Sequence, residues 1–125
     1  MNANIKSKWV AALRSGQYKQ GQYALRTDNK FCPLGLLCEL HRLETGQENW
    51  KTFANDKGCC SSYFGNSLAL PEKVILWAGL DSATPSIMMP GKKKSRSISL
   101  CNDGIKGKYK KLSFKEIANL IKNSL

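Results

Sequence analysis

A small α+β domain with about four helices and short antiparallel hairpins is the fold that this sequence predicts. Three observations support the prediction. The 125 residues match the usual length of one domain, and 42% of them are hydrophobic, which suffices for one core. Apolar residues recur at helical spacing in four segments. Between these segments they alternate with polar residues beside turn-forming ones. We therefore expect residues 1–125 to form a single globular domain.

The first expected helix covers residues 5–15. Asn4 can cap its N-terminus, and Gly16 can end it. Its apolar residues, which include Trp9 and Leu13, recur at helical spacing and predict one buried face.

A short hairpin is expected after this helix. Tyr23 and Leu25 lie two positions apart between the polar residues Gln22 and Arg26, and residues 30–32 can return as a second strand. Between them, Thr27, Asp28 and Asn29 favour a turn.

The second expected helix starts at Pro33, which suits the first helical position, and ends near Leu43. It is apolar on two faces, which predicts a central place in the core. The pattern weakens over residues 44–58, where Trp50 and Phe53 are the expected anchors. Residues 62–64 are expected to be extended.

Two further helices and a second hairpin complete the prediction. Pro71 starts a short helix that Gly79 ends. Residues 86–100 alternate on both sides of a basic tip and are expected to form a hairpin. The last helix has the clearest start, because Ser113 and Glu116 form a capping box.

Charge is the strongest functional signal in the sequence. The chain has 20 Lys and Arg against nine Asp and Glu, a formal net charge of +11. Such an excess favours polyanionic partners and salt-sensitive association. Eight cations lie in the basic segment, residues 92–111, against one acid, Asp103. These cations are Lys92, Lys93, Lys94, Arg96, Lys106, Lys108, Lys110 and Lys111. We predict that the basic segment contacts an anionic partner.

Part of the basic segment, around Gly104 and Gly107, has the residues of a general anion grip. Glycine backbone amides with flanking lysines can hold phosphate, and Tyr109 lies between lysines, where a base can stack. It is not a P-loop, because the spacing and the following Ser or Thr are missing. The alternative is a solvated lysine loop that keeps the protein soluble.

A second candidate surface surrounds the loop that follows the first expected helix. Arg14, Tyr18, Gln20 and Arg26 offer the cations, the amide and the ring that a pocket for a signalling nucleotide needs. The basic segment better suits a nucleic acid, which needs an extended basic surface. The sequence leaves both ligands open.

The sequence gives little support for a metal site or for a catalytic site. The single histidine, His41, follows Cys38 by three residues, but Cys32 and Cys38 are too widely spaced for a structural zinc pair. We expect the five cysteines to be small buried apolar groups and His41 to lie at a helix surface. No sequence signature orients Cys38 and His41 as nucleophile and base. We therefore predict no catalytic residue, no metal and no cofactor.

The N-terminal sequence and the hydropathy predict a cytoplasmic protein. Lys6 and Lys8 are not followed by the apolar stretch of a secretory signal. No segment approaches the roughly 20 apolar residues that cross a bilayer, so we expect no membrane partner. An odd number of cysteines fits a reducing compartment.

Five blocks of the sequence carry a recognisable pattern of residues. They are residues 8–20 (Trp-x3-Leu-Arg-Ser-Gly-x-Tyr-x-Gln within it), 31–40 (Phe-Cys-x-Leu-Gly-x-Leu-Cys), 70–80, 100–103 (Leu-x-Asn-Asp) and 114–118 (Phe-x-Glu-Ile-Ala). Together they resemble a family of small, uncharacterised phage and prophage proteins. In the second block, Pro33 stands where that family usually has Cys. The resemblance spans most of the chain and brings no assigned activity.

The resemblance implies an origin. Small phage proteins outside the virion are often anti-defence or host-modulating factors that bind a host target. We therefore expect a non-catalytic protein in the cytoplasm of an infected or lysogenic bacterium that binds a signalling nucleotide or a nucleic-acid backbone. The alternative is an inhibitor that covers an acidic surface of a host protein.

Overall fold

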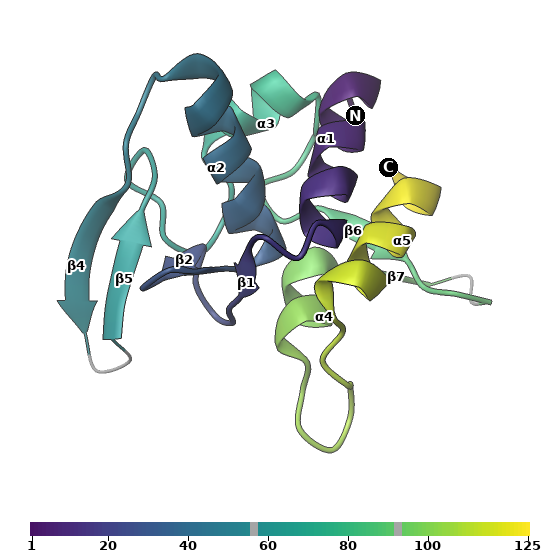
Figure 1. Cartoon of the computed structure of the whole chain (residues 1–125). Coiled ribbons are helices and arrows are strands. Elements are labelled where there is room, and N and C mark those ends of the chain that lie inside the picture. The colour runs from purple at the N-terminus through teal and green to yellow at the C-terminus, as the bar shows by residue number, and fades with distance from the viewer. Residues whose placement is uncertain (56–57, 92–93) are drawn as a thin grey trace.

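Helices and a small sheet share one core in the computed structural model of the chain, which describes residues 1–55, 58–91 and 94–125 (Figure 1). The helices are α1 (Ala3–Arg14), α2 (Pro33–Thr45), α3 (Glu72–Ala78), α4 (Ile98–Asp103) and α5 (Phe114–Ser124). The strands are β1 (Lys19–Gln20), β2 (Arg26–Thr27), β3 (Lys30–Phe31), β4 (Lys51–Asn55), β5 (Gly58–Ser62), β6 (Ser86–Met88) and β7 (Ser95–Ser97). This is the small α+β domain that the sequence predicts.

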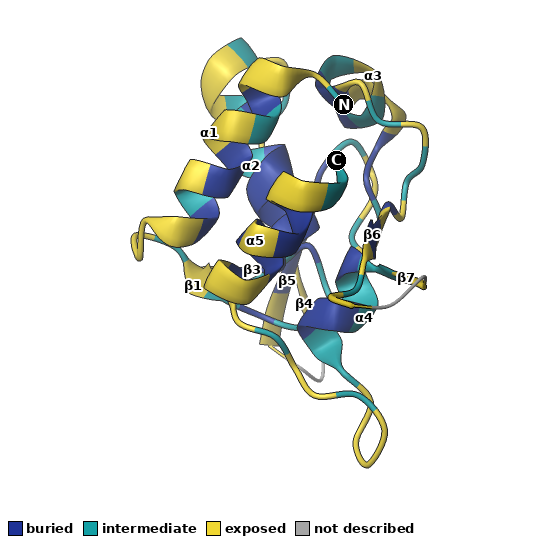
Figure 2. Cartoon of the chain, turned by 90° about the vertical axis from the view of Figure 1, so that its right-hand side faces the viewer, coloured by how far each residue is buried: buried dark blue, intermediate teal, exposed yellow. Residues whose placement is uncertain are grey.

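The helices α1 and α5 pack side by side and present exposed residues on their outer faces (Figure 2). The cap of α1 is Asn2, whose Oδ1 accepts hydrogen bonds from the backbone N–H of Asn4 and Ile5 at 3.0 Å, so the predicted cap at Asn4 is wrong. The helix begins two residues earlier than predicted because Asn2 already satisfies its free amides. The capping box at the start of α5 is confirmed.

The central helix is α2, as predicted. Gly35 in its first turn has no room for a side chain, since a Cβ there would lie 1.7 Å from the carbonyl oxygen of Leu25. The helix therefore rests directly on the backbone that leads into β2. The indole Nε1 of Trp9 donates to the carbonyl of Pro33 at 2.9 Å and so attaches α1 to the start of α2.

The main sheet has the strand order β1-β3-β2-β5-β4. Strands β1 and β3 are parallel, and the other neighbours are antiparallel. The hairpin predicted after the first helix is present as β2–β3, but its first strand is Arg26–Thr27 and not residues 23–25. The β4–β5 hairpin falls where the sequence pattern is weak, because much of β4 is exposed, including Phe53 at 45%. Phe53 is therefore not the buried anchor that we expected.

The second predicted hairpin is half right. Strands β6 and β7 pair in antiparallel fashion, but residues 98–103 form α4 instead of continuing the second strand. The Oγ of Ser97 accepts a hydrogen bond from the N–H of Leu100 at 3.1 Å and starts this helix, which buries Ile98 completely. No helix in the described residues is both long and apolar enough to span a membrane.

Candidate anion-binding surface

Two parts of the basic segment face one pocket, which we call the basic pocket. The β6–β7 hairpin contributes one wall, and the loop between α4 and α5 contributes another, around a volume of about 710 Å³. The lining residues are Met89, Lys94, Ser95, Arg96, Ser97, Leu100 and Tyr109. The structure thus places Lys94 and Arg96 beside Tyr109, which lies more than ten residues later in the sequence. Lys92 and Lys93 lie outside the described residues.

Tyr109 is the centre of this arrangement. The guanidinium carbon of Arg96 lies 3.8 Å from the centroid of its ring, and Nζ of Lys108 lies 5.2 Å from it. The backbone of Tyr109 pairs with that of Ile105 through hydrogen bonds of 2.8 and 2.9 Å, which closes the loop. Because a guanidinium held over a ring keeps its N–H groups at the edge, Arg96 remains able to donate to a ligand.

Among the described residues, most cations of the basic segment have no carboxylate partner. Within the described parts of the chain the ion pairs are Lys8–Glu44, Arg42–Glu39 and Lys110–Glu116, the last at 4.0 Å between exposed side chains. No described carboxylate lies within ion-pair distance of the other cations of the segment. These are Lys94, Arg96, Lys106, Lys108 and Lys111. Their charge is therefore available to an anionic ligand.

A second hollow of about 320 Å³, the loop pocket, adjoins the basic pocket. Its lining residues are Tyr23, Asp103, Gly104, Ile105, Lys106, Tyr109 and Lys111. Oδ1 of Asp103 accepts hydrogen bonds from the N–H of Tyr23 at 3.0 Å and from Nδ2 of Asn102 at 3.1 Å. Gly104 has φ +68°, and a Cβ there would lie 2.8 Å from the carbonyl oxygen of Tyr109. Glycine is therefore required for the loop to fold back.

Two residues of the surface predicted around the first loop are engaged within the fold. Nε2 of Gln20 donates to Oδ1 of Asn102 at 2.6 Å and to the carbonyl of Leu112 at 2.8 Å, and its Oε1 accepts from the N–H of Phe114 at 3.1 Å. Arg14 donates to the side chain of Asn119 on α5. Gln20 therefore connects β1, α4 and α5, with its amide groups already paired.

The other two residues of that surface, Tyr18 and Arg26, lie on neighbouring rings. Tyr18 meets Phe31 edge-on at 5.9 Å between centroids. The guanidinium of Arg26 lies over Phe31 at 5.6 Å and over Trp50 at 5.8 Å, and its Nε is buried with no hydrogen-bond partner among the described residues. The structure thus brings Tyr18 and Arg26 to one ring, Phe31, while Arg14 and Gln20 contact α5 and its N-terminal end.

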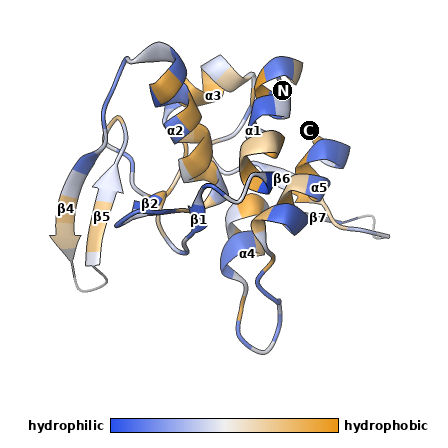
Figure 3. Ribbon diagram, viewed as in Figure 1, coloured by the Kyte–Doolittle hydropathy of each residue, from blue (hydrophilic) through white to orange (hydrophobic). Residues whose placement is uncertain are grey.

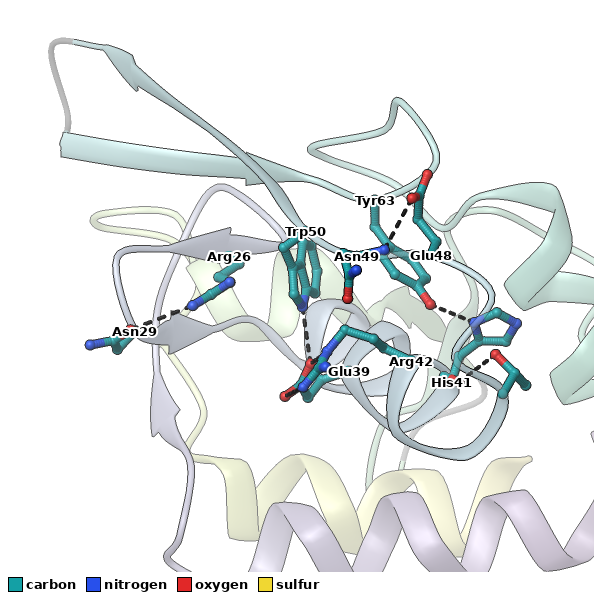
Figure 4. Close-up of polar contacts among 10 residues, drawn as sticks. Arg26, Asn29, Glu39, His41, Arg42, Glu48, Asn49, Trp50 and Tyr63 are labelled. Atoms are coloured by element: carbon teal, nitrogen blue, oxygen red, sulfur yellow. Dashed lines mark hydrogen bonds and ion pairs between the residues drawn. The ribbon is translucent and has the colours of Figure 1, made fainter.

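Glu39 is the carboxylate of this region, and its polar partners are Arg42 and Trp50 (Figure 4). Glu39 accepts from Nε and Nη2 of Arg42 at 2.6 and 2.9 Å and from Nε1 of Trp50 at 3.0 Å. Burial by itself raises the pKa of Glu39, but these hydrogen bonds and the nearby charges of Arg42 and Arg26 outweigh it and lower the pKa. The positive charge of Arg26 is therefore partly balanced within the chain.

His41 is buried, at 1% exposure, so its predicted place at a helix surface is wrong. The helix that carries it is covered on that side by aromatic residues, and Nδ1 of His41 lies 2.6 Å from the hydroxyl of Tyr63 (Figure 4). Burial raises the pKa of the Cys32 thiol to about 12 and that of Cys38 well above its ordinary value. Of the five cysteines, four are buried as predicted and Cys59 is exposed. The described residues contain no group of three or more metal-ligating side chains.

Comparison with known protein families gives one match. Residues 1–125 match the family described as "Domain of unknown function (DUF8296)". The chain belongs to this family. No curated protein and no solved structure matches it.

One pocket of the DUF8296 domain was not predicted from the sequence. This apolar pocket, of about 530 Å³, lies between the sheet and the loop that precedes β2. Its lining residues are Gly21, Gln22, Tyr23, Ala24, Thr27, Lys30, Phe53, Cys60, Ser67 and Leu68. Three of them are large and exposed: Tyr23 at 56%, Phe53 at 45% and Leu68 at 66%. They lie far apart in the sequence, so no local pattern links them.

Proposed function

We propose that this chain is a non-catalytic protein that binds a phosphate-bearing ligand, either a signalling nucleotide or a nucleic-acid backbone, in the basic pocket. One observation supports it above the others. Arg96 from the hairpin and Lys108 from the loop both lie over the ring of Tyr109, and neither has a described carboxylate partner. Cations from two elements converge there, whereas a merely solvated lysine surface would spread its charges apart.

The chemistry of the pocket suits phosphate. A guanidinium offers N–H donors in a fork that matches two phosphate oxygens, and an ammonium adds a mobile point charge. Lys94 and Ser95 extend the set of donors beside Arg96. The groups with nucleophilic or basic character, Cys38 and His41, are buried on α2 and are not among the residues that line this pocket. Binding without catalysis is therefore the function that we propose.

The biological role that we propose is that of a phage-encoded anti-defence or host-modulating factor. The resemblance of its sequence blocks to small phage proteins supports this role. Capture of a signalling nucleotide or coverage of a nucleic acid would each need the surplus of positive charge that the chain carries.

A salt titration of matched variants tests the proposal. We expect Lys94→Ala/Arg96→Ala to weaken binding to decathymidylate and to flatten the slope of log affinity against log salt by about 0.7 per lost phosphate contact. The control is Lys73→Ala/Lys122→Ala, which removes the same charge from α3 and the last turn of α5 and should change the slope little.

A panel of cyclic and linear nucleotides, measured by calorimetry, completes the test. If a nucleotide is the ligand, the basic-pocket variant should lose about tenfold or more in affinity, the scale of one charge-assisted hydrogen bond. Equal binding of every anion by the wild type and by Lys94→Ala/Arg96→Ala would refute the proposal. Loss of binding only to an acidic host protein would favour the alternative, an inhibitor of that protein.

A further inference from the structure

The loop pocket shares one lining residue with the basic pocket and another with the apolar pocket. Tyr109 lines both the basic pocket and the loop pocket, and Tyr23 lines both the loop pocket and the apolar pocket. In Figure 1 the β4–β5 hairpin and the β6–β7 hairpin lie on opposite sides of the molecule, and the α4–α5 loop projects from its lower end between them. A ligand longer than one nucleotide can therefore extend across these pockets from cations to aromatic rings.

The apolar pocket has the floor and walls of a site for flat rings. Thr27, Cys60 and Phe53 are cross-strand neighbours on one face of the sheet, and Lys30 stands beside Thr27 in the same row. Figure 3 shows hydrophobic residues on β4 and β5, away from the helical core. Tyr23 joins them from the loop before β2, with more than half of its side chain exposed. Exposed rings beside a cation are the recurring platform for nucleobases.

The backbone holds Tyr23 at the boundary between two pockets. Its φ is +70°, a left-handed conformation that a bulky residue rarely adopts and that costs about 1–3 kcal/mol elsewhere in proteins. The hydrogen bond from its N–H to Oδ1 of Asp103 stabilises that conformation. Tyr23 is thus fixed at the junction by a residue that itself lines the loop pocket.

Positive charge decreases from the basic pocket to the apolar pocket. Lys94 and Arg96 line the basic pocket, Lys106 and Lys111 line the loop pocket, and Lys30 lines the apolar pocket. Among the described lining residues of the three pockets, the one acid is Asp103, whose Oδ1 already accepts two hydrogen bonds. Phosphate groups are therefore attracted most strongly at the basic pocket, and the apolar pocket presents aromatic rings to a ligand.

We propose that the ligand is a single-stranded nucleic acid, whose phosphates contact the basic and loop pockets while its bases stack on Tyr23 and Phe53. The inference rests on the proposed function and names its ligand class. A mononucleotide would use a single pocket, and a duplex keeps its bases stacked inside. A single strand alone presents both phosphates and free base faces to such a surface.

The test compares three probes on the full-length chain by fluorescence anisotropy: labelled decathymidylate, a duplex of ten base pairs and thymidine monophosphate. We expect decathymidylate to bind at least tenfold more tightly than either of the others. Tyr23→Ala and Phe53→Ala should each weaken decathymidylate binding about fivefold to tenfold, the scale of one lost base–ring stack. Their salt slopes should stay at the wild-type value, because neither change removes a phosphate contact.

Matched variants separate stacking from folding and from general apolar contact. Tyr23→Phe keeps the ring and should bind like the wild type, whereas Phe53→Leu keeps an apolar side chain and should bind like Phe53→Ala. Leu76→Ala truncates another exposed apolar residue, on α3, and should change nothing. Thermal unfolding of every variant checks the fold.

Two results would overturn the inference. One is wild-type affinity of the Tyr23→Ala/Phe53→Ala variant for decathymidylate, and the other is tighter binding of the duplex or the monophosphate. In either case the salt slope of Lys94→Ala/Arg96→Ala still reports on the proposed function, so the two failures are distinguishable.

Discussion

The hydroxyl oxygen of Tyr63 and Nδ1 of His41 share a hydrogen bond of 2.6 Å inside the core. Both side chains are almost completely buried, and Trp77 meets the imidazole edge-on at 5.0 Å between centroids. Burial lowers the pKa of His41, although the charge of Glu44 opposes this shift. The folded protein therefore favours the neutral imidazole, and its stability is linked to pH.

The first prediction concerns this linkage. Because the pKa of His41 is lower in the folded state, the unfolded chain binds more protons, and the free energy of unfolding falls as pH decreases below about 6.5, the ordinary pKa of histidine. The slope should reach at most about 1.4 kcal/mol per pH unit. His41 is the single histidine, so the pH dependence of urea unfolding between pH 6.5 and about 5.5, above the range in which carboxylates titrate, should be much smaller in His41→Gln. An equal slope in that variant would contradict the assignment.

The second prediction concerns the partner of His41. Tyr63→Phe removes the hydroxyl and leaves a buried ring nitrogen without its hydrogen bond, which should cost about 1–3 kcal/mol of stability. Urea unfolding of Tyr63→Phe and of the wild type at pH 7.5 measures this loss of stability. The control is Tyr109→Phe, which removes a hydroxyl from an exposed loop and should change stability by less than about 0.5 kcal/mol.

The third prediction concerns the contact between α2 and the chain before β2. Gly35→Ala would place a Cβ 1.7 Å from the carbonyl oxygen of Leu25, and backbone atoms cannot move aside as the end of a side chain can. We expect a loss of about 3 kcal/mol or more, or failure to fold. Gly107→Ala is a comparison in open space, where only the strain of φ +78° applies and a smaller loss is expected. Similar stability of Gly35→Ala and the wild type would rule out this close packing.

The fourth prediction concerns the cysteines. Cys59 is the exposed thiol, while the others are buried and burial raises the pKa of Cys32, Cys38 and Cys101. Native protein treated with a maleimide at pH 7 should therefore gain one adduct by intact mass, and unfolded protein should gain five. Cys59→Ser should gain none in the native state. Two or more rapid native adducts would show that the buried thiols open readily.

Local signals in the sequence predicted the elements that local chemistry determines. The helix between Pro71 and Gly79 and the capping box at Ser113 depend on residues within a few positions of one another, and both are confirmed. The alternation of Ile98 and Leu100 suggested a strand, but the hydrogen bond from the N–H of Leu100 to Ser97 starts a helix there. That choice depends on packing in the core, where Ile98 is buried.

The candidate site was predictable only in its charges. The cations of the basic segment are visible as a cluster in the sequence, and Tyr109 lies among them. Its contact with Arg96 depends on how the hairpin and the loop meet, which no spacing reveals. The apolar pocket was missed for the same reason, because Tyr23 and Phe53 approach one cavity only through the register of the sheet and the turn of the loop.

The pairing of α1 with α5 determines when the core can close during synthesis. Phe114 follows Arg14 by about a hundred residues, yet these two helices pack against each other. At the usual rate of protein synthesis, about 5–20 residues per second, roughly 5–20 seconds pass between the synthesis of α1 and that of α5. Until α5 leaves the ribosome, the side of α1 that α5 covers stays exposed to chaperones and to neighbouring nascent chains.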